Sequence, residues 1–180
     1  MDLMLTLVGI AKLFFGFLVG VVGITIAARQ ATRFAGFESV DEGIRSGNAA
    51  LGLVVAGAVI SMAILVQHAV SGTFGALDLL LHASPGWAAL AWVLLYAVAN
   101  VGAALGVGAL LLTVGTRAFV RLTPEVDEIA EIHDGNIASA LVLAALFIAL
   151  ALLAQQGVET MLDGLLPIPS LGRDAAVAPG

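Results

Sequence analysis

Four long apolar segments constrain the fold of this chain more than any other feature. They cover residues 3–27, 48–67, 87–114 and 136–155. A helix that rises about 1.5 Å per residue needs about 20 apolar residues to cross a hydrocarbon core of about 30 Å. Each segment is long enough to do so. The sequence therefore predicts an all-α integral membrane protein with four transmembrane helices.

The composition excludes several other classes of protein. Of the 180 residues, 61% are apolar and 11% are charged, whereas a soluble domain has about 25% charged residues. A soluble enzyme domain and a disordered tail are therefore excluded. The net charge of −6 argues against nucleic acid as a partner, because phosphate contacts need clustered Lys and Arg. The expected partner is the lipid bilayer.

The arginines predict how the chain is oriented in the membrane. Five of them follow the first and third spans: Arg29, Arg33, Arg45, Arg117 and Arg121. The connection of residues 69–86 has neither Lys nor Arg. Because loops rich in Lys and Arg stay in the cytoplasm, we expect a multi-pass inner-membrane protein with both termini outside.

The chain also repeats itself at an offset of 88 residues, the separation of Asn48 and Asn136. Over residues 44–70, 12 of 27 positions are identical to those 88 residues later, against roughly one in ten expected by chance for this composition. The same offset matches arginines and threonines near the ends of the first and third spans: Thr25 with Thr113, Arg29 with Arg117, and Arg33 with Arg121.

This offset divides the chain into two units of similar length. We predict a first two-helix repeat at residues 1–86, a second at residues 87–166, and a peripheral tail at residues 167–180. Each repeat has an even number of spans, so the second copy enters the membrane in the same orientation as the first. The two repeats should be related by an axis along the membrane normal.

Each repeat carries an acidic stretch that leads into Gly-Asn at the start of its second helix. The two stretches are Glu38-Ser-Val-Asp41-Glu42 before Gly47-Asn48-Ala-Ala50, and Glu125-Val-Asp127-Glu128 before Gly135-Asn136-Ile-Ala138. In these motifs and their duplication, up to about residue 166, the chain resembles the YjfL-type bacterial and archaeal membrane proteins, a family of tandem "domain of unknown function 350" repeats. The resemblance implies a small four-helix inner-membrane protein of unassigned activity, sometimes encoded near envelope-stress genes.

Lys12 is the most informative single residue of the predicted spans. It falls about nine residues into the first span, roughly 13 Å deep at the rise of a helix, and its counterpart in the second repeat is Asn100. The four predicted spans contain no Asp or Glu, so we expect no carboxylate to neutralise Lys12. A charge at that depth is a functional-site hypothesis. Lys12 would line an aqueous path with Asn100 or bind an anion, or else its long stem would snorkel to the outer interface.

The hypothesis of an aqueous path past Lys12 also includes two pairs of polar residues. Asn48 and Asn136 open the second helix of each repeat, where Asn is a favoured N-cap. The alternative is a pair of carboxamides that coordinates an ion or water at the cytoplasmic entrance. Thr25 and Thr113 would then line the path between this entrance and Lys12.

Residues 123–134 predict a short acidic helix with Thr123 as its N-cap. Anionic lipid does not attract acidic helices, so we expect it to dock on protein, with the loop arginines as ion-pair partners. The candidate face for a cytoplasmic protein partner comprises Arg29, Arg33, Arg117, Arg121, Asp127, Glu128 and Glu131. The alternative is a divalent-cation site that uses Asp127, Glu131, His133 and Asp134.

The sequence contains no catalytic motif, so an enzyme is not expected, and no cofactor is expected. Two classes of function remain. The first is a structural or accessory membrane component, related to envelope stress, that binds a soluble partner. The second is a small oligomeric ion or solute channel or permease that uses Lys12 and Asn100 at mid-membrane. Small residues at four-residue spacing, Gly16 with Gly20 and Ala104 with Gly108, predict close helix pairing and a homo-oligomer.

Overall fold

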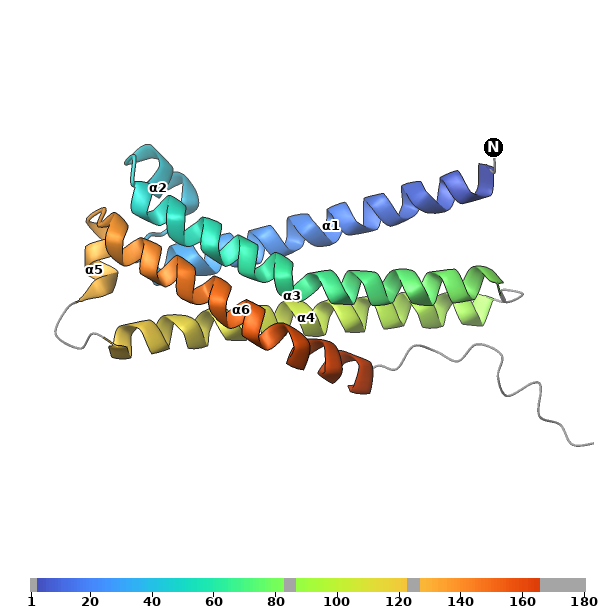
Figure 1. Ribbon diagram of the computed structural model, residues 1–180. Coiled ribbons are helices and arrows are strands. Elements are labelled where there is room, and N and C mark those ends of the chain that lie inside the picture. Colours follow the sequence, from blue (N-terminus) through green and yellow to red (C-terminus); the bar gives the residue numbers. More distant parts are fainter. Residues whose placement is uncertain (1–2, 83–86, 123–126, 166–180) are drawn as a thin grey trace, which may run out of the picture.

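The structure, a computed structural model, describes residues 3–82, 87–122 and 127–165 (Figure 1). In this part of the chain all regular structure is helical. The four long helices are α1 (Leu3–Phe34), α3 (Ala49–His82), α4 (Trp87–Leu122) and α6 (Ile137–Leu165). The short helices α2 (Val40–Arg45) and α5 (Glu128–His133) lie at the same end of the bundle, which we call the α2/α5 end. The fold is therefore all-α, as predicted.

The starts of the long helices match the predicted spans within one residue, but the predicted ends are too early. The clearest case is α3, which continues past Gln67 to His82, so most of the predicted connection of residues 69–86 is helical. A polar side chain does not end a helix. The first strong helix breaker after Gln67 is Pro85.

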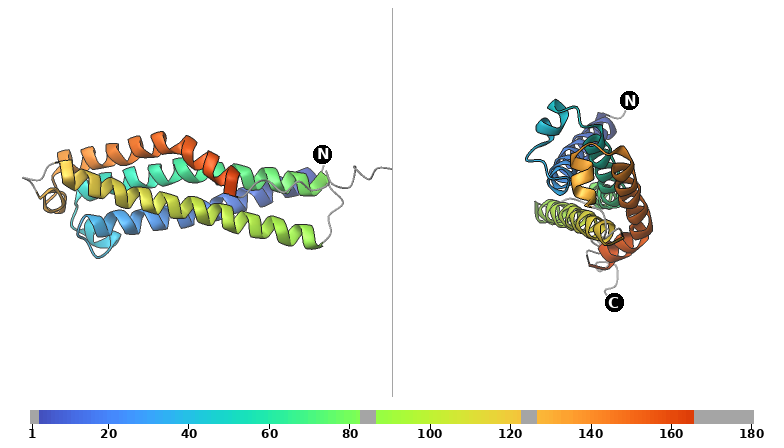
Figure 2. Two further views of the ribbon diagram at one scale, coloured as in Figure 1. Left: turned by 90° about the horizontal axis from the view of Figure 1, so that it is seen from below. Right: turned by 90° about the vertical axis from the view of Figure 1, so that its left-hand side faces the viewer.

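Helix α3 lies at the centre of the bundle and packs against α1, α4 and α6 (Figure 2). Its backbone comes closest to α6 at Gly57, where a Cβ would lie 2.6 Å from the Cβ and 2.7 Å from the Cα of Ala144. A second close contact joins α4 to α6, where Gly115 faces the ring of Phe147. Small residues thus allow the helix backbones to approach closely, as is common between membrane helices.

The two short helices have the same local structure, 88 residues apart. The side chain of Ser39 caps α2 and that of Asp127 caps α5, and each accepts the backbone N–H three residues later. Each short helix is followed by a glycine with positive φ, +68° at Gly47 and +94° at Gly135. Glycine adopts this left-handed conformation without a Cβ clash. The predicted N-cap at Thr123 lies outside the described residues, as does the tail at 167–180.

The long helices contain apolar stretches of sufficient length to cross a membrane: Thr6–Phe34, Ala49–Leu79, Leu90–Leu122 and Ile137–Gly164. Helix α1 diverges from α3 toward its N-terminus (Figure 1), and its large apolar side chains are exposed, with Leu13 at 70% and Phe17 at 69%. Such a surface is typical of helices that face lipid. The four apolar helices fit a multi-pass membrane protein.

Candidate functional site

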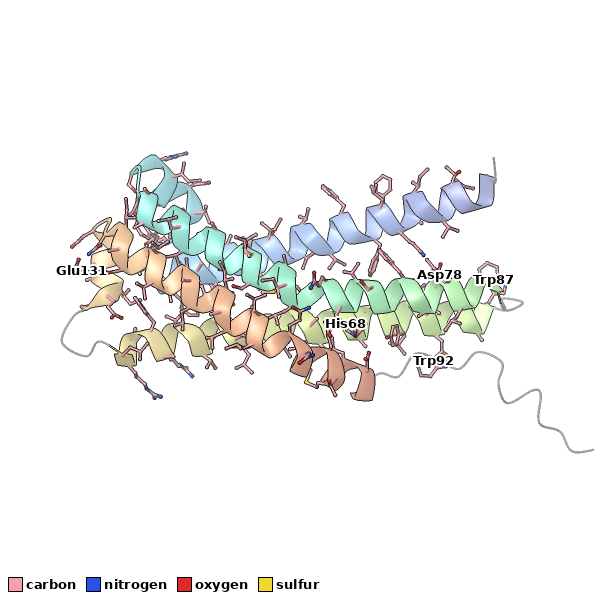
Figure 3. All side chains as sticks on the ribbon, in the orientation of Figure 1. His68, Asp78, Trp87, Trp92 and Glu131 are labelled. Carbon is pink, nitrogen blue, oxygen red and sulfur yellow. The ribbon has the colours of Figure 1, made fainter. Side chains whose placement is uncertain are left out.

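Lys12 of α1 forms an ion pair with Asp78 of α3. Its Nζ lies 2.6 Å from one carboxylate oxygen and 2.8 Å from the other, and 5.5 Å from the centre of the Phe74 ring. Asp78 lies on the half of α3 that is farther from the α2/α5 end (Figure 3). The expectation that no carboxylate neutralises Lys12 is wrong, because α3 continues as a helix through the predicted connection and carries Asp78 to α1.

Asn100 of α4 is only 2% exposed. Its Nδ2 donates to the carbonyl oxygen of Ala69 on α3, at 3.1 Å, rather than to a group near Lys12. Its Oδ1 is buried and has no hydrogen-bond partner among the described residues. A buried carbonyl oxygen without a donor costs about 1–3 kcal/mol. Asn100 thus joins α3 to α4 and leaves one polar atom unsatisfied in the core.

The two threonines of the predicted path lie in different surroundings. Thr25 is exposed, and its hydroxyl donates to the Val21 carbonyl one turn earlier. The hydroxyl of Thr113 accepts a hydrogen bond of 2.7 Å from Gln30 of α1. The amide of Gln30 also donates to the Ala109 carbonyl of α4, again at 2.7 Å. Gln30 therefore bridges α1 to α4, a role that no sequence motif indicated.

A cavity of about 410 Å³ lies between α1 and α3. Its walls are mostly apolar, with glycines from α1 at positions 16, 20 and 23 and two polar residues of α3, Gln67 and Ser71. Lys12, Asn100 and the two threonines are not among its lining residues. This cavity is therefore not the predicted path, because the residues predicted to line that path do not line it.

Asn48 and Asn136 both cap the helix that follows them. The side-chain oxygen of Asn48 accepts the N–H of Leu51 at 2.9 Å, and that of Asn136 accepts the N–H of Ala138 at 3.0 Å. The capping interpretation is thus confirmed. The two amide groups differ, because Nδ2 of Asn136 donates to Glu131 in its own repeat.

The amide of Asn48 instead reaches from the first repeat to the second. Its Nδ2 donates to the carbonyl oxygens of Ile132 and His133 at the end of α5, at 3.2 and 2.8 Å. The ring of His133 packs 4.4 Å from that of Phe37, which follows α1. These contacts hold α5 against the first repeat.

A cluster of titratable side chains that sequence reasoning missed joins α3 to α6. His68 of α3 faces two carboxylates of α6 (Figure 3), with Nε2 3.2 Å from Asp163 and Nδ1 3.8 Å from Glu159. Gln155 donates to the same oxygen of Glu159. The available signal was the four-residue spacing of Glu159 and Asp163, which places both on one helix face.

The arginines of the predicted partner face are all exposed: Arg29, Arg33, Arg117 and Arg121. The ion pairs of the described residues belong to Lys12 and His68, so the expected pairing of these arginines with α5 is wrong for this part of the chain. The alternative cation site on α5 is not formed either, since no three His, Asp or Glu side chains of the described residues come together in an arrangement that could hold a metal ion. Asp127 caps α5, and Glu131 is exposed beside it (Figure 3).

Glu128 differs from the other acids of this face because it is buried. It is 6% exposed, and its Oε2 has no hydrogen-bond partner among the described residues. Burial raises the pKa of the Glu128 carboxyl above its ordinary value, because an apolar environment disfavours the charged form. The sequence interpretation of Glu128 as a residue of the partner face is therefore wrong.

Replacing Glu128 with glutamine is expected to stabilise the protein near neutral pH. The folded-state pKa is higher than that of the unfolded chain. The protonated carboxyl therefore stabilises the fold fully below the unfolded-state pKa, and this contribution is lost as pH rises through the folded-state pKa. Thermal unfolding in detergent at pH values from about 4 to 8 would measure the effect, with exposed Glu131→Gln as the control. If the unfolding temperature of the wild type changes with pH in the same way as that of Glu128→Gln, the expectation is contradicted.

Two stretches of the chain, residues 4–101 and 93–168, match the family described as Domain of Unknown Function (DUF350). Together they span all four long helices, and their tandem arrangement agrees with the family resemblance drawn from the repeated motifs. No curated protein and no solved structure matches the chain. The chain is thus a tandem-repeat member of the Domain of Unknown Function (DUF350) family.

Proposed function

We propose that this protein is a non-enzymatic accessory component of the inner membrane whose α2/α5 end binds a soluble cytoplasmic protein. The observation that carries the proposal is the gathering of exposed charges of both signs at this end, without ion pairs among the described residues. Arg117 and Arg121 provide exposed positive charge at this end, and Glu131 provides exposed negative charge. Such charges steer a partner and fix its orientation. A role in envelope stress, which the family resemblance implies, belongs to this proposal.

The proposal places the α2/α5 end in the cytoplasm and both termini outside. Arginines near this end support that orientation, because positive residues stay on the cytoplasmic side. Two repeats of the same orientation, residues 1–86 and 87–166, are also part of the proposal. Their support is the equivalent capping of α2 and α5 and the common direction in which α1 and α4 run along the bundle toward the α2/α5 end (Figure 1).

The test reverses charges on the part of this face formed by α4 and α5. The partner is first identified by crosslinking in cells, and its affinity is then measured for the chain in nanodiscs. We expect Arg117→Glu/Arg121→Glu and Glu131→Lys each to weaken binding by about tenfold or more, because like charges then face each other. Gln156→Glu, an exposed change on the distal half of α6, should leave the affinity unchanged. Wild-type affinity in both reversed variants would refute this docking face.

The second candidate is a small homo-oligomeric ion or solute channel or permease. It is favoured by Asn100, whose buried oxygen lacks a donor, and by the exposed apolar surface of α1, which further copies of the chain would cover. Vesicles that contain the purified protein discriminate between the two candidates. A channel or permease produces a flux of ions or solutes across the vesicle membrane, and the accessory function requires none.

A further inference from the structure

A polar cavity of about 410 Å³ lies where α1 ends and α2 begins. It is separate from the apolar cavity between α1 and α3. Its lining comes from the last turns of α1 and from the segment that leads into α2: Arg29, Thr32, Arg33, Glu38, Ser39, Val40 and Asp41. It therefore lies at the end of an apolar helix, where lipid headgroups are found if α1 crosses the membrane.

The cavity separates charges of opposite sign. Arg29 and Arg33 are one turn apart and so lie on the same side of α1, whereas Glu38 and Asp41 come from the facing segment. Neither arginine forms an ion pair with these carboxylates or with any other described residue. Two guanidinium groups and two carboxylates thus border one cavity without forming ion pairs with each other.

The backbone of the acidic wall is held in place by local hydrogen bonds. Ser39 caps α2 by accepting the N–H of Glu42, and the carboxylate of Glu42 accepts the N–H of Glu38. This reciprocal arrangement resembles a capping box. It fixes the backbone at Glu38 and leaves the side chains of Glu38 and Asp41 available to a ligand.

A ligand of one charge does not suit this cavity. An anion would be attracted to the arginines but would meet two carboxylates, and a cation would meet the arginines. A ligand with both charges satisfies both walls, because guanidinium groups bind phosphate through paired N–H donors and carboxylates accept the N–H donors of an ammonium. We propose that the cavity binds a phosphodiester that bears a primary ammonium, the headgroup chemistry of phosphatidylethanolamine.

The second repeat provides a control within the same chain. Arg117 and Arg121 occupy the positions equivalent to Arg29 and Arg33, but the equivalents of Glu38 and Asp41 are Val126 and Ile129. The acidic residues of the second repeat, Glu125 and Asp127, stand at other positions relative to its arginine pair. We therefore expect the headgroup to bind at the first repeat, where arginines and carboxylates line one cavity.

The experiment measures which lipids stay bound to the purified protein. The full chain is placed in phosphatidylcholine nanodiscs with a minority of either phosphatidylethanolamine or phosphatidylglycerol, and the retained lipids are counted by native mass spectrometry. We expect the protein to retain about ten times more phosphatidylethanolamine than either of the other two lipids. Charge-assisted hydrogen bonds from its ammonium group to the carboxylates account for a difference of this size. Phosphatidylcholine serves as the critical comparison, because its quaternary ammonium has no N–H to donate.

Three variants connect this preference to the cavity. Arg29→Gln/Arg33→Gln should lose the retained phosphatidylethanolamine, whereas Arg117→Gln/Arg121→Gln should keep it. Glu38→Gln/Asp41→Asn should shift the preference to phosphatidylglycerol, and this variant tests the proposal even if the arginine variant misfolds. Equal retention of all three lipids by the wild type, or an unchanged preference in Glu38→Gln/Asp41→Asn, would overturn the proposal.

A soluble competitor distinguishes the source of the headgroup. If glycerophosphoethanolamine displaces the bound lipid, the site recognises the headgroup alone and also takes the free compound. If it does not displace the lipid, the acyl chains contribute and the ligand is the membrane lipid. The proposal does not depend on the docking of a cytoplasmic protein, because the docking test leaves the cavity residues Arg29, Arg33, Glu38 and Asp41 unchanged.

Discussion

Replacing Gly57 with leucine is expected to destabilise the helix bundle by about 3 kcal/mol, the upper range for overpacking a core. A Cβ at this position would lie 2.7 Å from the Cα and 3.0 Å from the carbonyl oxygen of Ala144. These are backbone atoms, so a rotation of one side chain does not relieve the clash. Helices α3 and α6 would have to separate along their shared interface. Unfolding in detergent, followed by circular dichroism, measures the loss.

Gly52 provides the matched control for this substitution. It lies on the same helix, it is exposed, and a Cβ there would meet nothing within 4 Å. Gly52→Leu should therefore be neutral or stabilise the protein by up to about 1 kcal/mol through its higher helix propensity. If the two leucine variants unfold at the same temperature, the close packing of α3 on α6 at Gly57 is wrong.

Replacing Lys12 with methionine is expected to cost about 2 kcal/mol of stability, because the ion pair between Lys12 and Asp78 is lost. Asp78→Asn should cost a similar amount, since Lys12 is left unpaired. The double variant Lys12→Met/Asp78→Leu contains neither charge and should recover most of the loss.

The four proteins of this double-mutant cycle are compared by unfolding in the same lipid or detergent. A strong positive coupling between the two positions is expected, because the side chains are in direct contact at 2.6 Å. Additive losses, with the double variant less stable than either single variant, would show that Lys12 and Asp78 act independently.

The sequence predicted the features of this fold that depend on local chemistry. Apolar runs placed the starts of the long helices, and the matched Asn48 and Asn136 predicted both N-caps, because a cap is decided by a few neighbouring residues. The helix ends were predicted less well. A polar residue such as Gln67 predicts the end of an apolar span, but its backbone still forms helical hydrogen bonds, so α3 continues toward Pro85.

The polar contacts between helices could not be predicted in the same way. Asp78 became the partner of Lys12 only because α3 extends beside α1, and the burial of Glu128 depends on how α5 packs. Which side chains meet across a bundle depends on helix rotation and crossing, and periodicity alone fixes neither.

The length of the central helices has a consequence for the membrane in which this protein resides. Helices α3 and α4, with 34 and 36 residues, are about 51 and 54 Å long at a rise of 1.5 Å per residue. Hydrophobic mismatch with a thinner bilayer is relieved by tilting, by local thickening of the lipid or by projection of the helix ends. We expect the tilt of this bundle to change with acyl-chain length, so that membranes of different thickness hold the same chain at different inclinations.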